Sequence, residues 1–209
     1  MTAARALGIV LLAAGGAVRY GSAKQLVAID GEPLVRRVAR EALRVSPWVT
    51  VVIGAYREDV EVALEGLPLD TAFHAGWPSG MGGSLAFGVR RLRERHPELT
   101  GVTVCLCDQP ALGAAQLQAL ADAAAPDRIV AADYGDGVVG VPCLFPSRFF
   151  HELDLLHGPE GARSLLALYA DQVQALPMPE ARIDIDTPDD YERWRTGSGR
   201  PGSLARRSA

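Results

Sequence analysis

The chain lacks any apolar run long enough to cross a membrane. No stretch of its 209 residues reaches the ~18 apolar residues that a spanning helix needs. The apolar residues 7–14 are not followed by the small-residue cleavage site and polar start of a secreted protein. These absences lead us to expect a cytoplasmic protein that has no membrane partner.

Cysteine is scarce, and charge of neither sign dominates. The three cysteines, Cys105, Cys107 and Cys143, show no zinc-site spacing, so we expect buried free thiols in a reducing compartment. The formal net charge is -4, with 21 basic and 25 acidic residues, which argues against nucleic acid as the main partner. An anionic small molecule stays compatible, because local Arg and Lys side chains can dominate a pocket.

Signatures of covalent catalysis are also missing. The four histidines show no pairing that suggests a triad, and no serine stands in a Gly-x-Ser-x-Gly elbow. The chain has neither a Walker A Gly-Lys-Ser/Thr nor a Gly-x-Gly-x-x-Gly dinucleotide fingerprint. We therefore look for chemistry in glycine loops, cations and carboxylates.

Short apolar runs alternate with helical patterns along the chain. Strands are predicted at residues 7–14, 49–55, 70–74, 101–107, 128–132, 138–145, 173–177 and 182–184. Helices are predicted at residues 33–45, 56–64, 85–95, 114–125, 147–155, 162–169 and 189–195. This alternation predicts a three-layer α/β fold, with a mostly parallel central sheet and helices on both faces. We expect one domain at residues 1–195 and a flexible, Gly/Ser/Arg-rich tail at residues 196–209.

The most informative segment is LLAAGGAVRYGSAKQL, residues 11–26. Gly15 and Gly16 interrupt the first apolar run, and Arg19 and Lys24 follow within ten residues. The backbone N–H groups of a glycine loop and two cations suit a polyphosphate. In an arbitrary loop such cations are usually solvated. Here the preceding buried strand and the glycines favour the functional interpretation.

Three aspartates are candidate metal ligands. Asp108 directly follows a buried strand in LCDQPAL, where it can bind Mg²⁺ or serve as a helix cap or turn residue. Asp184 and Asp186 stand at strand spacing, so both side chains are expected to point the same way. Of these two, Asp186 is the stronger metal candidate. Thr187 and Pro188 then predict a helix start.

The glycine-rich segment at residues 80–84, GMGGS, is predicted to be a loop before a helix. Its backbone N–H groups, around Gly82 and Ser84, could cradle a second anion or a base edge. The segment could equally be a linker that ends in a serine N-cap. Separated carboxylates, cations and glycine loops together suit a metal-assisted displacement at phosphorus.

Taken together, LAAGGAVRYGSAKQL, GMGGSL, LCDQPAL, GVP and DIDTPDD resemble the nucleotidyltransferases that act on molybdopterin, and among them the molybdenum cofactor cytidylyltransferases. The resemblance covers about residues 7–191. It implies a Rossmann-like nucleotidyltransferase fold. It also implies Mg²⁺-dependent transfer of a nucleotidyl group from an NTP to the phosphate of molybdopterin, with release of pyrophosphate. A molybdenum hydroxylase is then an expected acceptor protein.

The resemblance also implies roles for single residues. Arg19 and Lys24 would hold the triphosphate and act in catalysis with Asp108, and Asp108 and Asp186 would bind Mg²⁺. The Ala13-Ala14-Gly15 form resembles the cytidylyl branch and favours CTP over GTP. The expected nucleotide contacts, besides Arg19 and Lys24, are Leu12, Ala13, Ala14, Gly15, Gly16, Gly82 and Ser84.

Some positions depart from the family pattern. His74 stands where Asn is usual, Gln109 where Met is common, and Gly158-Pro159 replaces a usual Gly-Asp. These departures bear on the base and the acceptor more than on the reaction type. Two alternatives stay open: transfer to a sugar or alditol phosphate, and a chaperone that binds molybdenum cofactor without turnover. The full set of cations and carboxylates argues against the chaperone.

Overall fold

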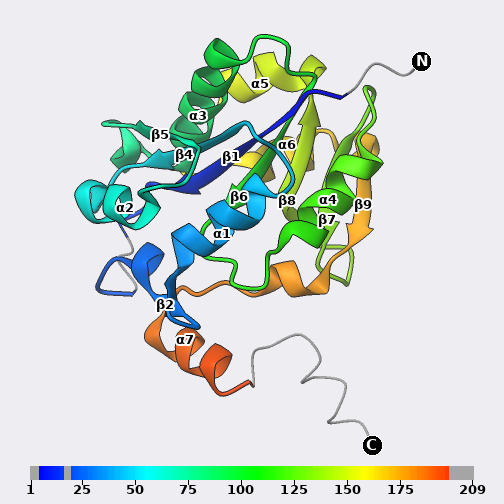
Figure 1. The fold of residues 1–209 in the computed structure, drawn as a ribbon. Helices are drawn as coiled ribbons and strands as arrows, with labels where there is room; N and C mark the ends of the chain where they lie inside the picture. The colour runs from blue at the N-terminus through cyan, green and yellow to red at the C-terminus, as the bar shows by residue number, and fades with distance from the viewer. Residues whose placement is uncertain (1–4, 17–19, 198–209) are drawn as a thin grey trace, which may run out of the picture.

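A seven-stranded sheet runs through the centre of the molecule, in the order β5-β4-β1-β6-β8-β7-β9 (Figure 1). The computed structural model describes residues 5–16 and 20–197. The strands are β1 (Leu7–Ala13), β4 (Val49–Ile53), β5 (Asp70–Phe73), β6 (Gly101–Leu106), β7 (Ile129–Asp133), β8 (Val139–Pro146) and β9 (Val173–Pro177).

One strand of this sheet is reversed. β8 is antiparallel to both of its neighbours, β6 and β7, and the other neighbouring pairs are parallel. The amino-terminal end of β8 therefore lies at the same sheet edge as the carboxyl ends of the other strands. Ligands of open α/β sheets bind beyond this edge.

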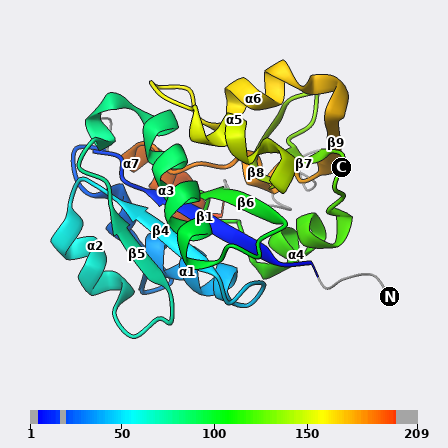
Figure 2. The ribbon, with the colours of Figure 1, turned by 90° about the horizontal axis from the view of Figure 1, so that it is seen from above.

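Helices cover both faces of the sheet (Figure 2). α1 (Leu34–Leu43), α2 (Arg57–Leu64), α4 (Ala114–Ala123) and α7 (Pro188–Arg195) pack on one side, and α3 (Met81–Arg95), α5 (Phe150–Asp154) and α6 (Ala162–Leu168) on the other. The arrangement confirms the predicted three-layer α/β fold. None of the helices among the described residues combines the length and apolar character needed to span a membrane.

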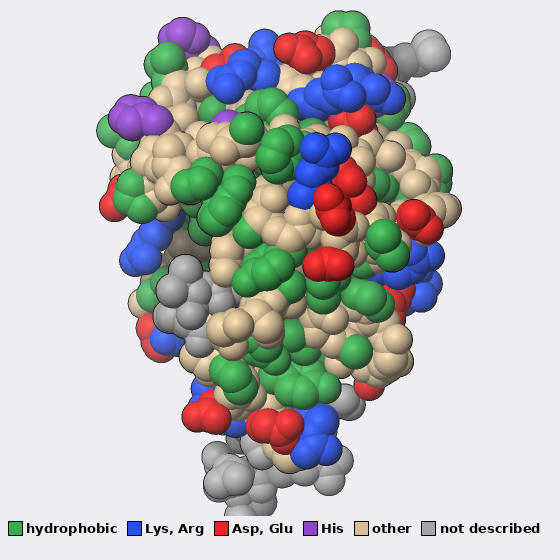
Figure 3. Space-filling view, turned by 90° about the vertical axis from the view of Figure 1, so that its left-hand side faces the viewer, with side chains coloured by type: hydrophobic (Ala, Val, Ile, Leu, Met, Phe, Trp, Pro, Cys, Tyr) green, Lys and Arg blue, Asp and Glu red, His purple; other side chains and the backbone are tan. Residues whose placement is uncertain are grey.

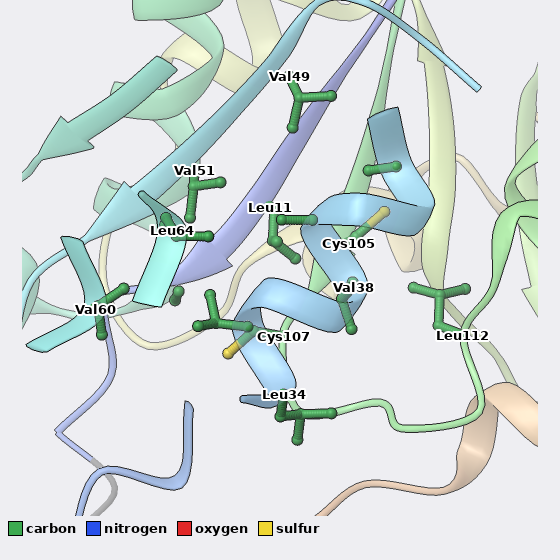
Figure 4. Close-up of a cluster of buried hydrophobic side chains, with 14 of the residues drawn as sticks. Leu11, Leu34, Val38, Val49, Val51, Val60, Leu64, Cys105, Cys107 and Leu112 are labelled. Atoms are coloured by element: carbon green, nitrogen blue, oxygen red, sulfur yellow. The ribbon is translucent and has the colours of Figure 1, made fainter. Parts of the chain in front are cut away.

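Alternate residues of the strands pack into separate hydrophobic clusters on the two faces of the sheet. Leu11 of β1 packs with α1, whereas its neighbour Val10 packs with α3. Figure 4 shows the first core, where Leu11, Val51 and Cys105 come from three adjacent strands beside α1. Cys107 belongs to the same core, as the two-residue spacing predicts. Cys105, Cys107 and Cys143 are all free and buried, as expected.

The prediction of a loop at residues 80–84 is wrong, because α3 already begins at Met81. Gly80, at φ 125°, ends a short 3-10 turn, η2 (Trp77–Ser79). Gly82 N donates to Gly158 O at 2.9 Å, and a Cβ on Gly82 would lie 2.6 Å from a backbone oxygen of the 157–160 loop. The glycines therefore let the first turn of α3 pack closely on that loop.

The predicted strand at residues 182–184 does not form. Pro179–Arg182 make a 3-10 turn, η5, and Ile185 N then donates to Asp108 O at 2.9 Å. Asp108 lies beyond the end of β6, so this single bond is not part of a strand ladder. The predicted start of α7 is confirmed: Thr187 Oγ1 accepts from Asp190 N at 3.2 Å in a capping box. The expected tail lies mostly at residues 198–209, outside the described residues.

Several short elements were not predicted. β2 (Ala28–Ile29) and β3 (Glu32–Pro33) pair around Asp30 and Gly31, which both have positive φ. An Asp-Gly pair suits such a tight turn. The other elements are the 3-10 turns η1 (Lys24–Leu26), η3 (Ser147–Phe149) and η4 (Ala170–Gln172). η3 occupies the first three residues of the helix predicted at residues 147–155, and α5 follows it directly.

The side of the molecule that carries α2 and the edge strand β5 is shown in Figure 3, where hydrophobic side chains lie among acidic and basic ones. Tyr56, Val62 and Phe73 are exposed here. The Arg57 guanidinium lies 4.7 Å above the centre of the Phe73 ring. A charged group over an exposed ring in this way reduces the apolar surface at the sheet edge.

Candidate active site

A cavity of about 340 Å³ opens at the sheet edge where β1 and β6 end. Seven of the residues predicted from the sequence line it: Leu12, Ala13, Ala14, Gly15, Lys24, Ser84 and Asp108. They come from segments far apart in the chain, and the parallel strands bring them together. The other lining residues were not among the predicted site residues, although Gly80 and Met81 belong to the predicted glycine-rich segment and Pro159 to a departure from the family pattern. These other residues are Gln25, Trp77, Pro78, Gly80, Met81, Leu106, Cys107 and Pro159.

The loop after β1 is held by hydrogen bonds to its carbonyl groups. Cys107 N donates to Leu12 O at 3.2 Å. The side chain of Gln25, which is 1% exposed, donates through Nε2 to Ala13 O at 3.0 Å and to Gly15 O at 2.6 Å. With these carbonyls occupied from the protein side, residues 12–15 have a fixed course along the cavity.

Trp77 forms a wall beside this loop. A Cβ on Gly16 would lie 3.1 Å from the Trp77 ring, and a Cβ on Gly54 only 2.6 Å from Trp77 Cγ. Gly54 therefore has no room for a side chain while Trp77 keeps this position. At Gly15, by contrast, a Cβ would meet nothing within 4 Å, so this glycine faces open space.

Lys24 bridges two of the predicted metal ligands. Its Nζ lies 2.6 Å from Asp108 Oδ2 and 2.8 Å from Asp186 Oδ1. The three side chains are 17%, 14% and 27% exposed, so solvent screens this pairing only in part. Burial by itself would lower the pKa of the Lys24 ammonium, but the charges and hydrogen bonds of the two carboxylates outweigh it and raise that pKa. Lys24 is thus a fixed positive charge.

Two short loops bring the carboxylates to the lysine. Asp108 follows β6 after one intervening residue, and its carbonyl accepts from Ile185 N. Asp186 N donates to Asp190 Oδ2 at 3.1 Å, which ties this segment to α7. The second carboxylate oxygen of Asp108, Oδ1, is buried and has no hydrogen-bond partner. An unpartnered buried carboxylate oxygen is suited to a cation.

Asp184 does not contact Lys24 through a described hydrogen bond, but it lies near the other two acids. Loss of solvation and the charges of Asp108 and Asp186 raise its pKa to about 7. Its side chain still has an exposed surface, so part of this effect is screened by solvent. The three carboxylates form an acidic cluster that Lys24 neutralises only in part.

The remaining predicted residues are less closely placed. Gly16 contacts the Trp77 wall and does not line the cavity, and Gly82 faces the 157–160 loop. Ser84 is buried, and its Oγ lies 3.5 Å from Gly80 O. Arg19 lies outside the described residues. Gln25 was missed although it stands beside Lys24 in the motif, because its contacts to β1 are tertiary.

The donor set fits a cation that also binds phosphate. Among the described residues, no group of three or more His, Cys, Asp or Glu side chains could hold a metal ion alone. Mg²⁺ usually takes one or two carboxylates and completes its shell with water and substrate phosphates. Asp108 and Asp186 can supply those carboxylates, provided that a triphosphate brings the remaining oxygens.

Solved structures of other proteins share this fold. Rv0371c from Mycobacterium tuberculosis H37Rv is 29% identical, with a TM-score of 0.78, and the match covers 91% of this chain and 98% of that one. A manganese complex of Rv0371c is 27% identical, with a TM-score of 0.73, and the match covers 90% of this chain and 96% of that one.

Two more distant structures show the fold alone. Molybdopterin-guanine dinucleotide biosynthesis protein A from Archaeoglobus fulgidus is 16% identical, with a TM-score of 0.64, over 91% of this chain and 98% of that one. The 4-diphosphocytidyl-2C-methyl-D-erythritol synthase from Anaerococcus prevotii DSM 20548 is 13% identical, with a TM-score of 0.75, over 94% and 97%.

Comparison with curated proteins gives no significant match. A family model for the MobA-like NTP transferase domain, however, matches residues 9–175. This range contains most of β1, the loop that follows it, Lys24 and Asp108. The chain therefore belongs to the family of MobA-like NTP transferase domains.

Proposed function

We propose that this NTP transferase moves the cytidylyl group of CTP to the phosphate of molybdopterin and releases pyrophosphate, with Mg²⁺ as its cofactor. The observation that carries the proposal is the Lys24 ammonium held between Asp108 and Asp186 beside a cavity lined by the nucleotide loop. Cation and carboxylates at one sheet edge suit transfer at phosphorus, where charge neutralisation and positioning do most of the catalysis.

Asp108 and Asp186 are the residues that would hold Mg²⁺. The buried, unpartnered Oδ1 of Asp108 supports this assignment. The manganese complex of Rv0371c supports a divalent cation at a related fold. When bound, Mg²⁺ supplies positive charge to the phosphate oxygens and to the departing pyrophosphate.

The chain's own residues position and neutralise the triphosphate. In the reaction, a phosphate oxygen of the acceptor bonds to the α-phosphorus, and the bond from that phosphorus to the bridging β-oxygen breaks. Lys24, which keeps its proton, places its charge where the oxygens of the transferred group become more negative. Gln25 holds Ala13 and Gly15, so the base and ribose meet a loop of fixed shape.

The choice of CTP rests on the Ala13-Ala14-Gly15 form of the nucleotide loop, and all three residues line the cavity. The choice of molybdopterin rests on the motif resemblance, and the name of the Archaeoglobus protein supports it. Transfer to an alditol phosphate is the second candidate. The name of the Anaerococcus protein supports it, as does Pro159, a departure from the family pattern that lines the cavity.

The test is pyrophosphate release with each of the four NTPs and either molybdopterin or a panel of sugar and alditol phosphates. We expect turnover with CTP and molybdopterin in Mg²⁺. Turnover confined to alditol phosphates would show that the acceptor is an alditol phosphate and not molybdopterin. Molybdopterin binding without pyrophosphate release from any NTP would favour a cofactor chaperone. Asp186→Asn is expected to lose activity. Asp189→Asn, an exposed acid in the first turn of α7, is the matched control that should keep it.

A further inference from the structure

Gln109 directly follows Asp108 and is 1% exposed. Its Nε2 donates to Val141 O at 3.0 Å and to Ala181 O at 2.6 Å. Both acceptors are carbonyl oxygens, so only the amide nitrogen of Gln109 can face them. The side chain thereby joins the loop after β6 to the start of β8 and to η5.

An amide is unfavourable to bury at this position for packing alone. Oε1 of Gln109 is buried and accepts no hydrogen bond, which is a destabilising arrangement. A methionine or leucine would fill a similar volume without an unpaired oxygen. The two bonds that Nε2 donates to carbonyl oxygens, together with its interaction with the Asp184 carboxylate, are therefore the property that favours a glutamine here.

These bonds hold the segment that leads to Asp186. The segment from Ala181 to Ile185 is held at both of its ends by residues 108–109: Gln109 Nε2 holds Ala181 O, and Asp108 O accepts from Ile185 N. Asp186 follows at once, with its carboxylate 2.8 Å from Lys24. A shift of η5 would move Asp186 relative to Asp108, which contacts the same ammonium at 2.6 Å.

We propose that Gln109 is a positioning residue, which sets the spacing of Asp108 and Asp186 by fixing η5 to the end of β6. The inference rests on the proposed function, in which both carboxylates serve one cation and one triphosphate. Removing a residue that orients metal ligands typically lowers metal affinity about 10–100-fold. An effect of that size is expected here.

Two variants separate positioning from general stability. Gln109→Met keeps the length of the side chain and removes both donors. Gln116→Met is the matched control, since Gln116 of α4 also reaches η5, where its Nε2 donates to Glu180 Oε1 at 2.8 Å. The control weakens the attachment of η5 without touching the residues that carry the carboxylates.

The first measurement needs no activity. Lys24 is the only lysine in the sequence, so protein labelled with ¹³C-lysine gives a single Cε resonance. The chemical shift of this resonance reports the surroundings of the Lys24 ammonium. We expect this resonance to move in Gln109→Met, without nucleotide or metal, and to stay in place in Gln116→Met. An unchanged resonance in Gln109→Met, whatever its thermal stability, would overturn the inference.

The second measurement, made by calorimetry, is the Mn²⁺ concentration at which CTP binding is half-maximal. Gln109→Met should raise it about 10–100-fold, whereas Gln116→Met should leave it within twofold of the original. At saturating Mn²⁺, kcat for pyrophosphate release should fall in Gln109→Met while the KM for CTP stays unchanged. A midpoint within twofold of the original protein in Gln109→Met would overturn the inference. A resonance that moves in a protein that never binds CTP would instead overturn the proposed function and leave the positioning role intact.

Discussion

Lys24→Met removes the cation that holds two carboxylates together while it keeps an unbranched side chain of similar length. In the native chain the ammonium contacts Asp108 at 2.6 Å and Asp186 at 2.8 Å. The variant leaves these acids, and Asp184 nearby, without that counter-charge. It should therefore lose stability, and it should bind a divalent cation better than the native chain does in the absence of nucleotide.

The exposure of the pair sets the magnitude. Fully exposed ion pairs contribute about 0–1 kcal/mol, and loss of one partner of a buried pair costs about 3–5 kcal/mol. Side chains that are 14–27% exposed lie between these limits, so we expect about 1–3 kcal/mol. In a chain of this length, 1 kcal/mol moves Tm by about 2–4 °C. Loss of the charge in the transition state should lower kcat about 10²–10³-fold.

The assays are urea and thermal unfolding with and without MnCl₂, together with pyrophosphate release. Arg195→Met is the control, because it breaks the exposed Arg195–Glu192 pair and should change stability by less than about 0.5 kcal/mol. At 100 times its Kd, Mn²⁺ should stabilise Lys24→Met by about 2.7 kcal/mol. The same Mn²⁺ concentration should stabilise the native chain less. A variant as stable as the native chain, with the same response to Mn²⁺, would refute the bridging role.

Three further predictions follow from the same geometry. Gln25→Met leaves two loop carbonyls without their donor, and it should raise the KM for CTP in steady-state assays; an unchanged KM would show that the clamp is not needed for nucleotide binding. Gly54→Ala places a Cβ against the Trp77 ring and should destabilise the protein by about 1–3 kcal/mol in urea unfolding. Gly15→Ala, which meets nothing within 4 Å, should fold normally, and equal stabilities would contradict the packing argument. Burial lowers the pKa of His74 below 6.5, so its contribution to stability is complete above pH 6.5 and is lost as pH falls through the lowered value. His74→Gln should therefore lose less stability than the native chain between pH 7 and pH 5, and identical losses would show that His74 does not titrate in this way.

Local pattern was enough for the layers of this fold. The apolar runs that became β1, β4 and β6 are buried on both faces, which is the hydrophobicity expected of central parallel strands. The sequence signals for the start of α7 were also local, since Thr187 and Asp190 form the capping box and Pro188 stands in the first turn. The start of α3 could not be found in this way. Its glycines are typical of a loop unless the 157–160 backbone packs against them.

The candidate site likewise contains residues that local sequence predicted and contacts that it did not predict. Lys24, Asp108 and Asp186 were recognised from their residue types and from their places after predicted strands. Their mutual contacts depend on the strand order, which brings residues 24, 108 and 186 to one sheet edge. Gln25 carried no signal of its own, and Gln109 was noted only as a departure from the family pattern, because the bonds that both side chains donate go to backbone carbonyls placed by the fold.

The sequence by itself predicted the α/β class from its periodicity, and the family and the chemical character of the site from short motifs that resemble those of known nucleotidyltransferases. Only the tertiary structure decided that Lys24 lies between two carboxylates, that Trp77 lies beside Gly16 and Gly54, and that two buried glutamines donate to backbone carbonyls around the candidate site. The physical reason is that hydrogen bonds and ion pairs act over about 3 Å, a distance that sequence spacing cannot specify for segments more than 80 residues apart.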